Sequence, residues 1–356
     1  MPDPTKDMAA ANSGAGAVRV ALDQAALEQW LGAKVPGYAG PLDIAQFNGG
    51  QSNPTYLLTT PGARYVLRRK PPGPLLKGAH DVLREARVLT ALGTTSFPVP
   101  QVLGIGENEA VIGSSFYVME MVEGRIFWDA ALESVLISER AAYFDAMNET
   151  IAALHSVDVE AVGLGGFGRP GNYFARQIGR WSKQYLEDEL AGRDRDMDAL
   201  VEWLPTAIPE GDETSVVHGD FRCDNIIFHP AEPRVLAVLD WELSTLGHPL
   251  ADFAYHAMMY RMPGDIVAGI GGRDPVALGL PTEQQYIAAY CRRTGREGID
   301  NWDFYLAFNF FRLAAILHGI KGRVMRGTAT NAQAMKRAKA LPRLSALARE
   351  AMEACP

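Results

Sequence analysis

Three oxygen-bearing side chains, Asp220, Asn225 and Asp240, stand within one informative stretch of the sequence. Asp220 lies in HGDFRCDN, a polar run that follows the apolar pair Val216–Val217, and Asn225 comes five residues after it. Carboxylate and amide oxygens are ligands that Mg²⁺ prefers, and the ion takes its other ligands from water and substrate phosphates. A further carboxylate on a loop can orient an attacking hydroxyl and accept its proton. Because phosphoryl transfer requires a protein mainly to position groups and neutralise charge, the three residues together predict that reaction.

A β-hairpin is expected to position two of these side chains. Residues 226–228 and 235–239 are apolar runs on either side of a turn, which is the pattern of two paired strands. Asn225 directly precedes the first run and Asp240 follows the second. The hairpin therefore brings Asn225 and Asp240 side by side, with Asp220 on the loop that leads into it.

The sequence before this stretch indicates a short helix, capped by Asp23 and ending near Leu31, and then a small sheet with a second helix. Short apolar runs broken by glycine and proline pairs predict strands, and apolar residues at three- and four-residue steps predict a helix that Gly93 ends. The expected strands are residues 42–47, 55–60, 64–69, 101–106 and 116–121. The rest of the chain is helical in pattern, at residues 139–155 and 174–190 and from Pro281 onward, apart from the hairpin.

The HGD triplet, the asparagine five residues later and the aspartate after a hairpin resemble the catalytic arrangement of the aminoglycoside phosphotransferase and choline kinase-like family, whose members are relatives of the protein kinases. Three further segments resemble the branch of this family found beside, or fused to, acyl-CoA dehydrogenases. They are GGQSNPTYLL (49–58), YVLRRKPPG (65–73) and GHPLADFAYHAMMY (247–260). The resemblance covers nearly the whole chain from residue 21.

The expected fold is α+β, a two-lobed protein kinase-like fold with a small antiparallel β N-terminal lobe and a larger, mainly helical C-terminal lobe. The expected divisions are a disordered tail over residues 1–20, an ATP-binding lobe over residues 21–122, and a catalytic and acceptor-binding lobe over residues 123–356.

The resemblance also implies roles for individual positions. Asp220 matches the catalytic base, and Asn225 and Asp240 match the ligands of Mg²⁺. Arg68 stands where a kinase has the lysine of its third strand, so it is expected to contact the phosphates of ATP, with Glu85 as its ion-pair partner. The other positions implied to contact ATP belong to a phosphate-covering loop and to the backbone of a hinge: Gly49, Gly50, Gln51, Ser52, Asn53, Glu120 and Val122.

Several positions depart from the kinase pattern. Lys70 lies on the same strand face as Arg68, so either residue could contact the phosphates. The loop at residues 49–53 lacks the full GxGxxG spacing. Trp241–Glu242 stand where a protein kinase has Phe-Gly, so a DFG-type switch is not implied. Arg222 stands where many protein kinases carry a lysine, and it is interpreted as stabilising charge in the transition state.

Neighbouring residues have simpler interpretations. His218 is expected to brace the catalytic loop, Asp252 to support the loop after Asp240 through hydrogen bonds, and Cys223 to be a small buried filler. Residues 163–168 fit GxGxxG by letter, but no strand precedes them, so they predict a loop. A zinc site would lack both an HExxH motif and a cysteine cluster; its ligands would be His218, Asp220, Asp224 and His229.

The composition limits the partners and the compartment. The net charge of −8 over 356 residues makes nucleic acid and anionic membranes poor candidates. The three cysteines are far apart and form no CxxC pair, which favours a reducing compartment. No signal-peptide pattern and no apolar run of about 18 residues is present. We therefore expect a cytoplasmic protein that binds neither nucleic acid nor membrane.

The expected substrates are ATP, with Mg²⁺, and a small molecule that carries a hydroxyl. A polycationic aminoglycoside would require an acidic pocket, whereas the C-terminal segment is basic. Its basic residues are Lys321, Arg323, Arg326, Lys336, Arg337, Lys339, Arg343 and Arg349. These charges favour an anionic or CoA-linked acceptor, although they also fit a solvated helix face. The branch resemblance implies a hydroxyacyl substrate.

Three alternatives stay open from the sequence. Within the kinase class, the acceptor could be an amino alcohol, a sugar or an aminoglycoside. The chain could instead be a nucleotide-binding pseudokinase that serves as a binding module. It could also hydrolyse a phosphate ester with a metal ion, a reaction that releases phosphate without ATP.

Overall fold

The structure is a computed structural model that describes residues 15–19, 21–47, 53–71, 80–328 and 338–355. By its internal contacts the chain divides into two units, which are described separately below. The sheet unit contains Met1–Phe127, Val159–Leu164 and Arg222–Ser244. The helical unit contains Trp128–Asp158, Gly165–Phe221 and Thr245–Pro356. The division differs from the expected boundary near residue 122, because residues 222–244 group with the N-terminal sheet.

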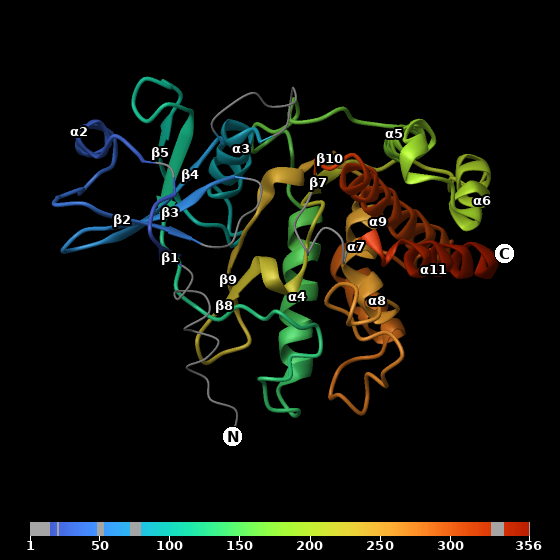
Figure 1. The fold of residues 1–356 in the computed structure, drawn as a ribbon. Coiled ribbons are helices and arrows are strands. Elements are labelled where there is room, and N and C mark those ends of the chain that lie inside the picture. The colour runs from blue at the N-terminus through green and yellow to red at the C-terminus, as the bar shows by residue number, and fades with distance from the viewer. Residues whose placement is uncertain (1–14, 20, 48–52, 72–79, 329–337, 356) are drawn as a thin grey trace. The chain divides into compact units, whose positions relative to one another are not determined.

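Six strands form one antiparallel sheet in the sheet unit, in the order β1-β2-β3-β4-β6-β5 (Figure 1). Alternate residues of the central strands are buried on one face, as the two-residue period of a strand requires. Leu58, Leu67 and Val118 pack there with Leu27 and Leu31 of the first helix. The strands are β1 (Ala15–Gly16), β2 (Asp43–Phe47), β3 (Thr55–Thr59), β4 (Arg64–Arg69), β5 (Val102–Gly106) and β6 (Phe116–Glu120).

Two helices accompany this sheet, α2 (Gln24–Lys34) and α3 (Val82–Leu92). Helix α3 begins where the side chain of Asp81 accepts a hydrogen bond from the amide of Arg84, and it ends at Gly93. Its apolar stripe contacts β5 and β6. Glu85 lies within that buried stripe, so the helix carries a carboxylate into the interior of the unit.

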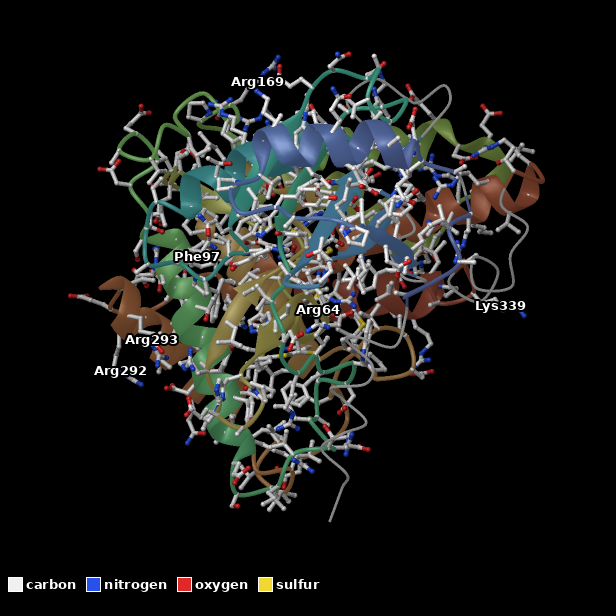
Figure 2. All side chains as sticks on the ribbon, turned by 90° about the vertical axis from the view of Figure 1, so that its left-hand side faces the viewer. Arg64, Phe97, Arg169, Arg292, Arg293 and Lys339 are labelled. Carbon is white, nitrogen blue, oxygen red and sulfur yellow. The ribbon has the colours of Figure 1, made fainter. Side chains whose placement is uncertain are left out.

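The expected hairpin is present in the sheet unit. Strand β8 (Ile226–Phe228) pairs antiparallel with β9 (Val235–Val238). Short 3₁₀ turns at Cys223–Asn225 and Trp241–Leu243 precede and follow it. Phe97, labelled in Figure 2, packs edge-on against Trp241 with ring centroids 5.8 Å apart. This contact anchors the turn that follows Asp240.

The helical unit consists mainly of helices around one long central helix, α9, which contacts α5, α7 and α11 (Figure 1). A two-stranded antiparallel pair, β7 with β10, flanks the segment that leads to Asp220. The elements are β7 (Ser215–Val217), β10 (Thr245–Gly247), α4 (Arg140–His155), α5 (Tyr173–Glu187), α6 (Arg195–Trp203), α7 (Pro249–Ala257), α8 (Glu283–Thr294), α9 (Trp302–Met325) and α11 (Leu341–Ala354).

Helix α7 lies in the interior of the helical unit. All nine of its residues are buried, including Asp252, Tyr255 and His256. Helix α8 is joined to α4 by Arg293, labelled in Figure 2, which donates hydrogen bonds of 2.8 Å to Asn148 and to Asp145. The helical unit thus buries polar groups of α7, and side-chain hydrogen bonds tie α8 to α4.

The predicted α+β fold is confirmed, and so is the change from strands to helices along the chain. The sequence missed the short strands β1, β7 and β10, which hold two or three residues each. Ala15–Gly16 pairs with β2 inside the segment expected to be a disordered tail, and residues 1–14 of that tail lie outside the described residues. Residues 163–168 form turns and loop, as expected. Among the described helices, none has the length and apolar character that a membrane crossing requires.

Candidate active site

Arg68 is the centre of an ionic network in the sheet unit. It lies near the end of β4, where its Nε is 2.8 Å from Oε2 of Glu85. Its Nη2 donates a 2.8 Å hydrogen bond to Oδ1 of Asp240 and lies 3.6 Å from a carboxylate oxygen of Glu242. The structure thus brings together Arg68, Glu85 and Asp240, which the sequence placed on a strand, a helix and the end of a hairpin.

Glu85 is held by neutral side chains as well as by Arg68. Its side chain is only 2% exposed. Asn53 donates a 2.6 Å hydrogen bond to Oε1, and the hydroxyl of Tyr117 donates a 3.2 Å bond to Oε2. Burial raises the pKa of Glu85 to about 7, although the Arg68 guanidinium counteracts the rise. The buried ion pair with Glu85 restricts the position of the Arg68 guanidinium.

The position of Asn53 differs from the expectation for a phosphate-covering loop. Its side chain is fully buried. Its amide nitrogen is bonded to Glu85, and its amide oxygen lies 3.2 Å from Nδ1 of His80. Both ends of the amide therefore have polar partners, as a buried amide requires. The side chain supports the network and is not turned toward a ligand. Gly49, Gly50 and Ser52 lie outside the described residues.

Asp240 has a backbone conformation that is unusual for its residue type. Its φ of 64° lies in the left-handed region, which costs a residue other than glycine about 1–3 kcal/mol and is often found at functional sites. The indole of the next residue, Trp241, donates a 2.9 Å hydrogen bond to the carbonyl of Val238 and is buried. The conformation turns the chain so that the Asp240 side chain stays 35% exposed while its neighbour is anchored.

Asn225 and Asp240 lie at the same end of the hairpin. The amide of Leu239 donates a 2.8 Å hydrogen bond to the carbonyl of Asn225, which continues the pairing of Ile226 with Val238 by one residue. The set of donors, a carboxylate and a side-chain amide, fits the preference of Mg²⁺ for oxygen ligands. Among the residues that the structure describes, no group of three or more His, Cys, Asp or Glu could hold a metal ion. A zinc site is therefore not supported in that part of the chain.

Two other predicted site residues, Arg222 and Glu120, are bonded to neighbouring residues. Arg222 pairs with Asp224 through Nε, at 2.9 Å from Oδ1, and through Nη2. Its charge is therefore already engaged by a neighbour two residues away. Glu120 closes the end of the sheet, because its amide donates to the carbonyl of Gln101 and its carboxylate accepts from the amide of Gln101.

Among the described residues, Lys70 and Val122 have no side-chain partners like those of Arg222 and Glu120. Lys70 directly follows β4, and its amide donates to the carbonyl of Ser115. No ion pair of its side chain is present among the described residues, whereas Arg68 makes several. Val122 follows the end of β6 and is partly buried. The geometry therefore favours Arg68 over Lys70 as the fixed cation of the sheet unit.

The loop that carries Asp220 lies in the helical unit and is held by α7. The carboxylate of Asp252 accepts hydrogen bonds from the amides of His218, at 2.7 Å, and Gly219, at 2.8 Å. Asp252 was expected to support the loop after Asp240, but it holds the segment before Asp220, because its side chain extends from α7 toward the end of β7. Gly219 has a φ of 83°, a conformation that glycine adopts at little cost.

His218 and His256 complete the support of this loop. Nδ1 of His218 accepts a 3.2 Å hydrogen bond from the amide of Asp220, which agrees with a bracing role. Nδ1 of His256 lies 3.2 Å from the carbonyl of Phe221, and its Nε2 lies 2.6 Å from the hydroxyl of Tyr286. Since a carbonyl only accepts, Nδ1 carries the proton and Nε2 accepts from the tyrosine. Burial lowers the pKa of His256 to about 4, so the ring is neutral.

Asp220 itself is in contact with α7 and close to α9. The hydroxyl of Tyr255 donates a 2.5 Å hydrogen bond to its Oδ1. Arg312 of α9 donates a 2.9 Å hydrogen bond to the carbonyl of Gly219, and its guanidinium lies over the Tyr255 ring at 5.3 Å from the centroid. Side chains from two helices therefore hold the carboxylate and the backbone beside it.

Residues 43–308 match the sequence profile described as the phosphotransferase enzyme family. The chain belongs to this family. As a family member it is similar to acyl-CoA dehydrogenase family member 10 of Mus musculus, with 44% identity over 332 residues that cover 92% of this chain and 31% of the mouse protein. It is also similar to acyl-CoA dehydrogenase family member 11 of Gallus gallus, with 46% identity, covering 87% of this chain and 41% of the chicken protein. The phosphotransferase chain thus spans less than half the length of these relatives.

Solved structures agree with the family and the fold. A Ralstonia eutropha protein, provisionally named an aminoglycoside phosphotransferase, superposes with a TM-score of 0.87 at 50% identity and covers 94% of this chain and 99% of its own. A thermostable mutant of aminoglycoside phosphotransferase APH(4)-Ia, in a ternary complex with ADP and hygromycin B, superposes with a TM-score of 0.59 at 17% identity. That likeness covers 91% of this chain and 98% of the other, and at this identity it shows the fold alone. The resemblance to the aminoglycoside phosphotransferase family and its acyl-CoA dehydrogenase-associated branch is confirmed.

Sequence reasoning missed several side chains of this phosphotransferase that contact either the Arg68 network or the loop of Asp220. Tyr255 and His256 lie in the segment 247–260 that carried part of the resemblance, but no role was inferred for them. Tyr117 lies in a run predicted as a strand, and Arg312 in the region predicted to be helical, but no role was inferred for either side chain. One signal was available. Asp252, Tyr255 and His256 are spaced three and four residues apart, which places them on one helix face.

Proposed function

We propose that this chain transfers the γ-phosphate of ATP, with Mg²⁺, to the hydroxyl of a small anionic molecule, a hydroxy acid or a hydroxyacyl-CoA. The observation that carries the proposal is the ionic network in which Arg68 is held between Glu85 and Asp240. A buried carboxylate fixes the cation from one side, and a carboxylate that is 35% exposed meets it from the other. Such an arrangement keeps a phosphate-binding cation in place before ATP arrives.

On the nucleotide side, Arg68 is assigned the contact with the phosphates of ATP. Arginine is suited to this because its planar guanidinium presents several donors to phosphate oxygens. Burial lowers the pKa of Arg68, but the surrounding carboxylates outweigh this effect and raise it, so the charge is retained. The backbone near Glu120 and Val122 is assigned to adenine, and the loop of Gly49, Gly50 and Ser52 to the phosphates.

Asn225 and Asp240 are assigned to hold Mg²⁺, as their oxygen donors fit. When bound, the ion offsets negative charge that develops on the transferred phosphoryl group. Asp240 also accepts a hydrogen bond from Arg68. Its carboxylate has two oxygens, so it can keep one bond to the arginine and offer the other oxygen to a cation.

Asp220 is assigned the proton of the acceptor hydroxyl. As the hydroxyl oxygen forms its bond to the γ-phosphorus, the bond from phosphorus to the β,γ-bridging oxygen breaks and ADP leaves, while the proton passes to the Asp220 carboxylate. Arg222 is proposed to stabilise the charge of the transition state. Because Arg222 is paired with Asp224, this role requires either donors left over from that pair or its release.

The anionic class of the acceptor is supported by two observations. The C-terminal segment from Lys321 carries eight basic and two acidic residues in a chain with a net charge of −8. The relatives with 44% and 46% identity are named for acyl-CoA dehydrogenases, whose chemistry concerns acyl-CoA thioesters. A competing acceptor, an aminoglycoside, is favoured by the provisional name of the Ralstonia eutropha protein.

A panel assay tests the proposal. Purified protein is incubated with ATP and Mg²⁺ and one acceptor at a time: free hydroxy acids, their CoA thioesters, choline, sugars, and kanamycin-type aminoglycosides. We expect ADP release and a phosphorylated product only with the anionic acceptors, and a loss of about 10²–10⁴-fold in kcat for Asp220→Asn. The control Glu187→Gln removes an exposed ion pair to Lys183 and should leave the rate unchanged. Turnover of aminoglycosides alone would overturn the acceptor class, and release of phosphate without ATP would overturn the transferase.

A further inference from the structure

The hydroxyl of Tyr255 donates a hydrogen bond to Oδ1 of Asp220, and both residues lie in the helical unit. We propose that Tyr255 is a positioning residue: it holds one oxygen of the Asp220 carboxylate so that the other faces the acceptor hydroxyl. This inference rests on the proposed function for the identity of Asp220 as the base. It adds a residue to which neither the sequence motif nor the comparisons assign a role.

The chemistry of the pair fixes the direction of the bond. An ionised carboxylate only accepts hydrogen bonds, so the phenol must donate. The terminal torsion of an aspartate is broad and roughly two-fold, which leaves its carboxylate plane poorly defined without a partner. A donor on Oδ1 therefore selects one orientation of the plane, and that orientation decides where Oδ2 points.

Tyr255 is itself well placed for this task. Its side chain is on α7, one residue before His256 and three after Asp252, and it is 8% exposed. The Arg312 guanidinium covers its ring while Nη2 of the same arginine donates to the carbonyl of Gly219. The ring and the loop backbone are thus held by one side chain. A cation over the face of a tyrosine ring is attractive and restrains the ring.

A second cluster in the helical unit repeats these residue types and provides the comparison. The hydroxyl of Tyr185 donates a 2.6 Å hydrogen bond to Oδ1 of Asp198, and the guanidinium of Arg193 lies 5.2 Å from the centroid of the Tyr185 ring. There, however, the arginine pairs with the aspartate itself, at 2.7 Å. In the cluster around Asp220 the arginine is bonded to a backbone carbonyl instead. The second cluster has the form of a structural ion pair, whereas the first holds a carboxylate by a neutral donor.

The two tyrosines give a matched pair of variants. Tyr255→Phe and Tyr185→Phe each remove a tyrosine hydroxyl that donates to an aspartate. In both cases an arginine guanidinium lies over the tyrosine ring. We expect Tyr255→Phe to lower kcat by about 10–100-fold, because misplacing a reacting group by about 1 Å costs up to that factor. The KM for ATP should stay within about twofold, since the nucleotide side is untouched. Tyr185→Phe should change neither constant, and melting temperatures of both variants show whether the losses come from unfolding.

A high-resolution crystal structure of Tyr255→Phe gives a readout that does not need activity. We expect the Asp220 carboxylate to rotate or to adopt two orientations, while the backbone of residues 218–221 stays as in the wild type. A single, unchanged carboxylate, or an unchanged kcat, would overturn the positioning role. If the wild type turns over none of the acceptors, the proposed function fails, and the crystal structure alone then decides the role of Tyr255.

Discussion

The ionic network around Arg68 and the loop that carries Asp220 are held in different ways. In the sheet unit, charged side chains from β4, α3 and the end of the hairpin meet, and the bond from Arg68 to Asp240 joins residues 172 positions apart. In the helical unit, the backbone of His218, Gly219 and Phe221 is bonded to side chains of α7 and α9. The first region is held by charges, and the second by hydrogen bonds to the main chain.

This difference suits two different tasks. An ion pair in which one partner is 35% exposed can exchange that partner for a ligand of the same charge, because solvent screens part of its energy. A backbone amide bonded to a buried carboxylate cannot be released without leaving a buried polar group unsatisfied, which costs about 1–3 kcal/mol. We infer that the network around Arg68 is built to receive a ligand and that the loop of Asp220 is built to stay fixed.

The largest expected effect comes from the exposed end of the ionic network. Asp240→Asn removes a negative charge that meets Arg68 and is assigned to Mg²⁺. We expect kcat to fall by about 10³-fold, as for the loss of a group that stabilises transition-state charge, and the Mg²⁺ concentration for half-maximal rate to rise. Steady-state kinetics over a Mg²⁺ titration measure both quantities. An unchanged Mg²⁺ requirement, or the same loss of rate in the control Glu187→Gln, would contradict the assignment.

The buried loop should instead respond to pH through His256. Its pKa of about 4 is depressed by burial from 6.5, so at lower pH the unfolded chain binds a proton that the folded chain does not. The contribution of His256 to the free energy of unfolding is constant above pH 6.5. It falls by about 3 kcal/mol in total as the pH drops from 6.5 toward 4.

Urea unfolding at a series of pH values tests this dependence. His256→Asn keeps a side-chain donor for the carbonyl of Phe221 but has no proton to take up, so its curve should be flatter by about 3 kcal/mol. The control His229→Asn replaces a partly exposed histidine and should keep the slope of the wild type. Equal slopes in the wild type and His256→Asn would show that the burial of this ring does not set the acid sensitivity.

Asp252 should matter for stability. Burial alone would raise its pKa, but the hydrogen bonds and charges of His155 and His218 outweigh burial and lower it. Asp252→Asn places a donor where two amides donate, so we expect the free energy of unfolding to fall by about 2 kcal/mol. The melting temperature and the unfolding midpoint in urea measure the loss. A variant as stable as the wild type would show that the loop does not depend on this carboxylate.

The sequence predicted most of the fold because its signals are local. The apolar runs of β2, β3, β4 and β6 and the periodic helix α3 were found to within a few residues. The strands β1, β7 and β10 were missed, since runs of two or three residues carry no period. The pairing of the two hairpin runs was predicted, but not its register, which shifts between Ile227 and Phe228.

The contacts of the site could be predicted only where the family motif specified them. Arg68 and Glu85 were expected to pair because of the resemblance, and the structure brings them together. The hydrogen bonds from Asn53 to Glu85 and from Tyr255 to Asp220 depend on how helices and loops pack against one another. Such packing is a tertiary property that spacing along one segment does not encode. Asp252 shows the limit: its supporting role was anticipated, but not the loop that it holds.

The smallest change in rate is expected from a substitution at the buried end of the ionic network. Glu85→Gln removes the charge that fixes Arg68 from behind but keeps an oxygen that can accept from Tyr117, so the arginine shifts and is not lost. We expect kcat/KM for ATP to fall by about tenfold, since a displaced cation meets the phosphates less well. The control Glu123→Gln changes an exposed partner of Arg64, the first residue of β4, which is labelled in Figure 2. It should leave kcat/KM unchanged, because an exposed pair contributes about 0–1 kcal/mol. If both variants behave alike, burial of Glu85 does not position Arg68, and the network is no more organised than a surface ion pair.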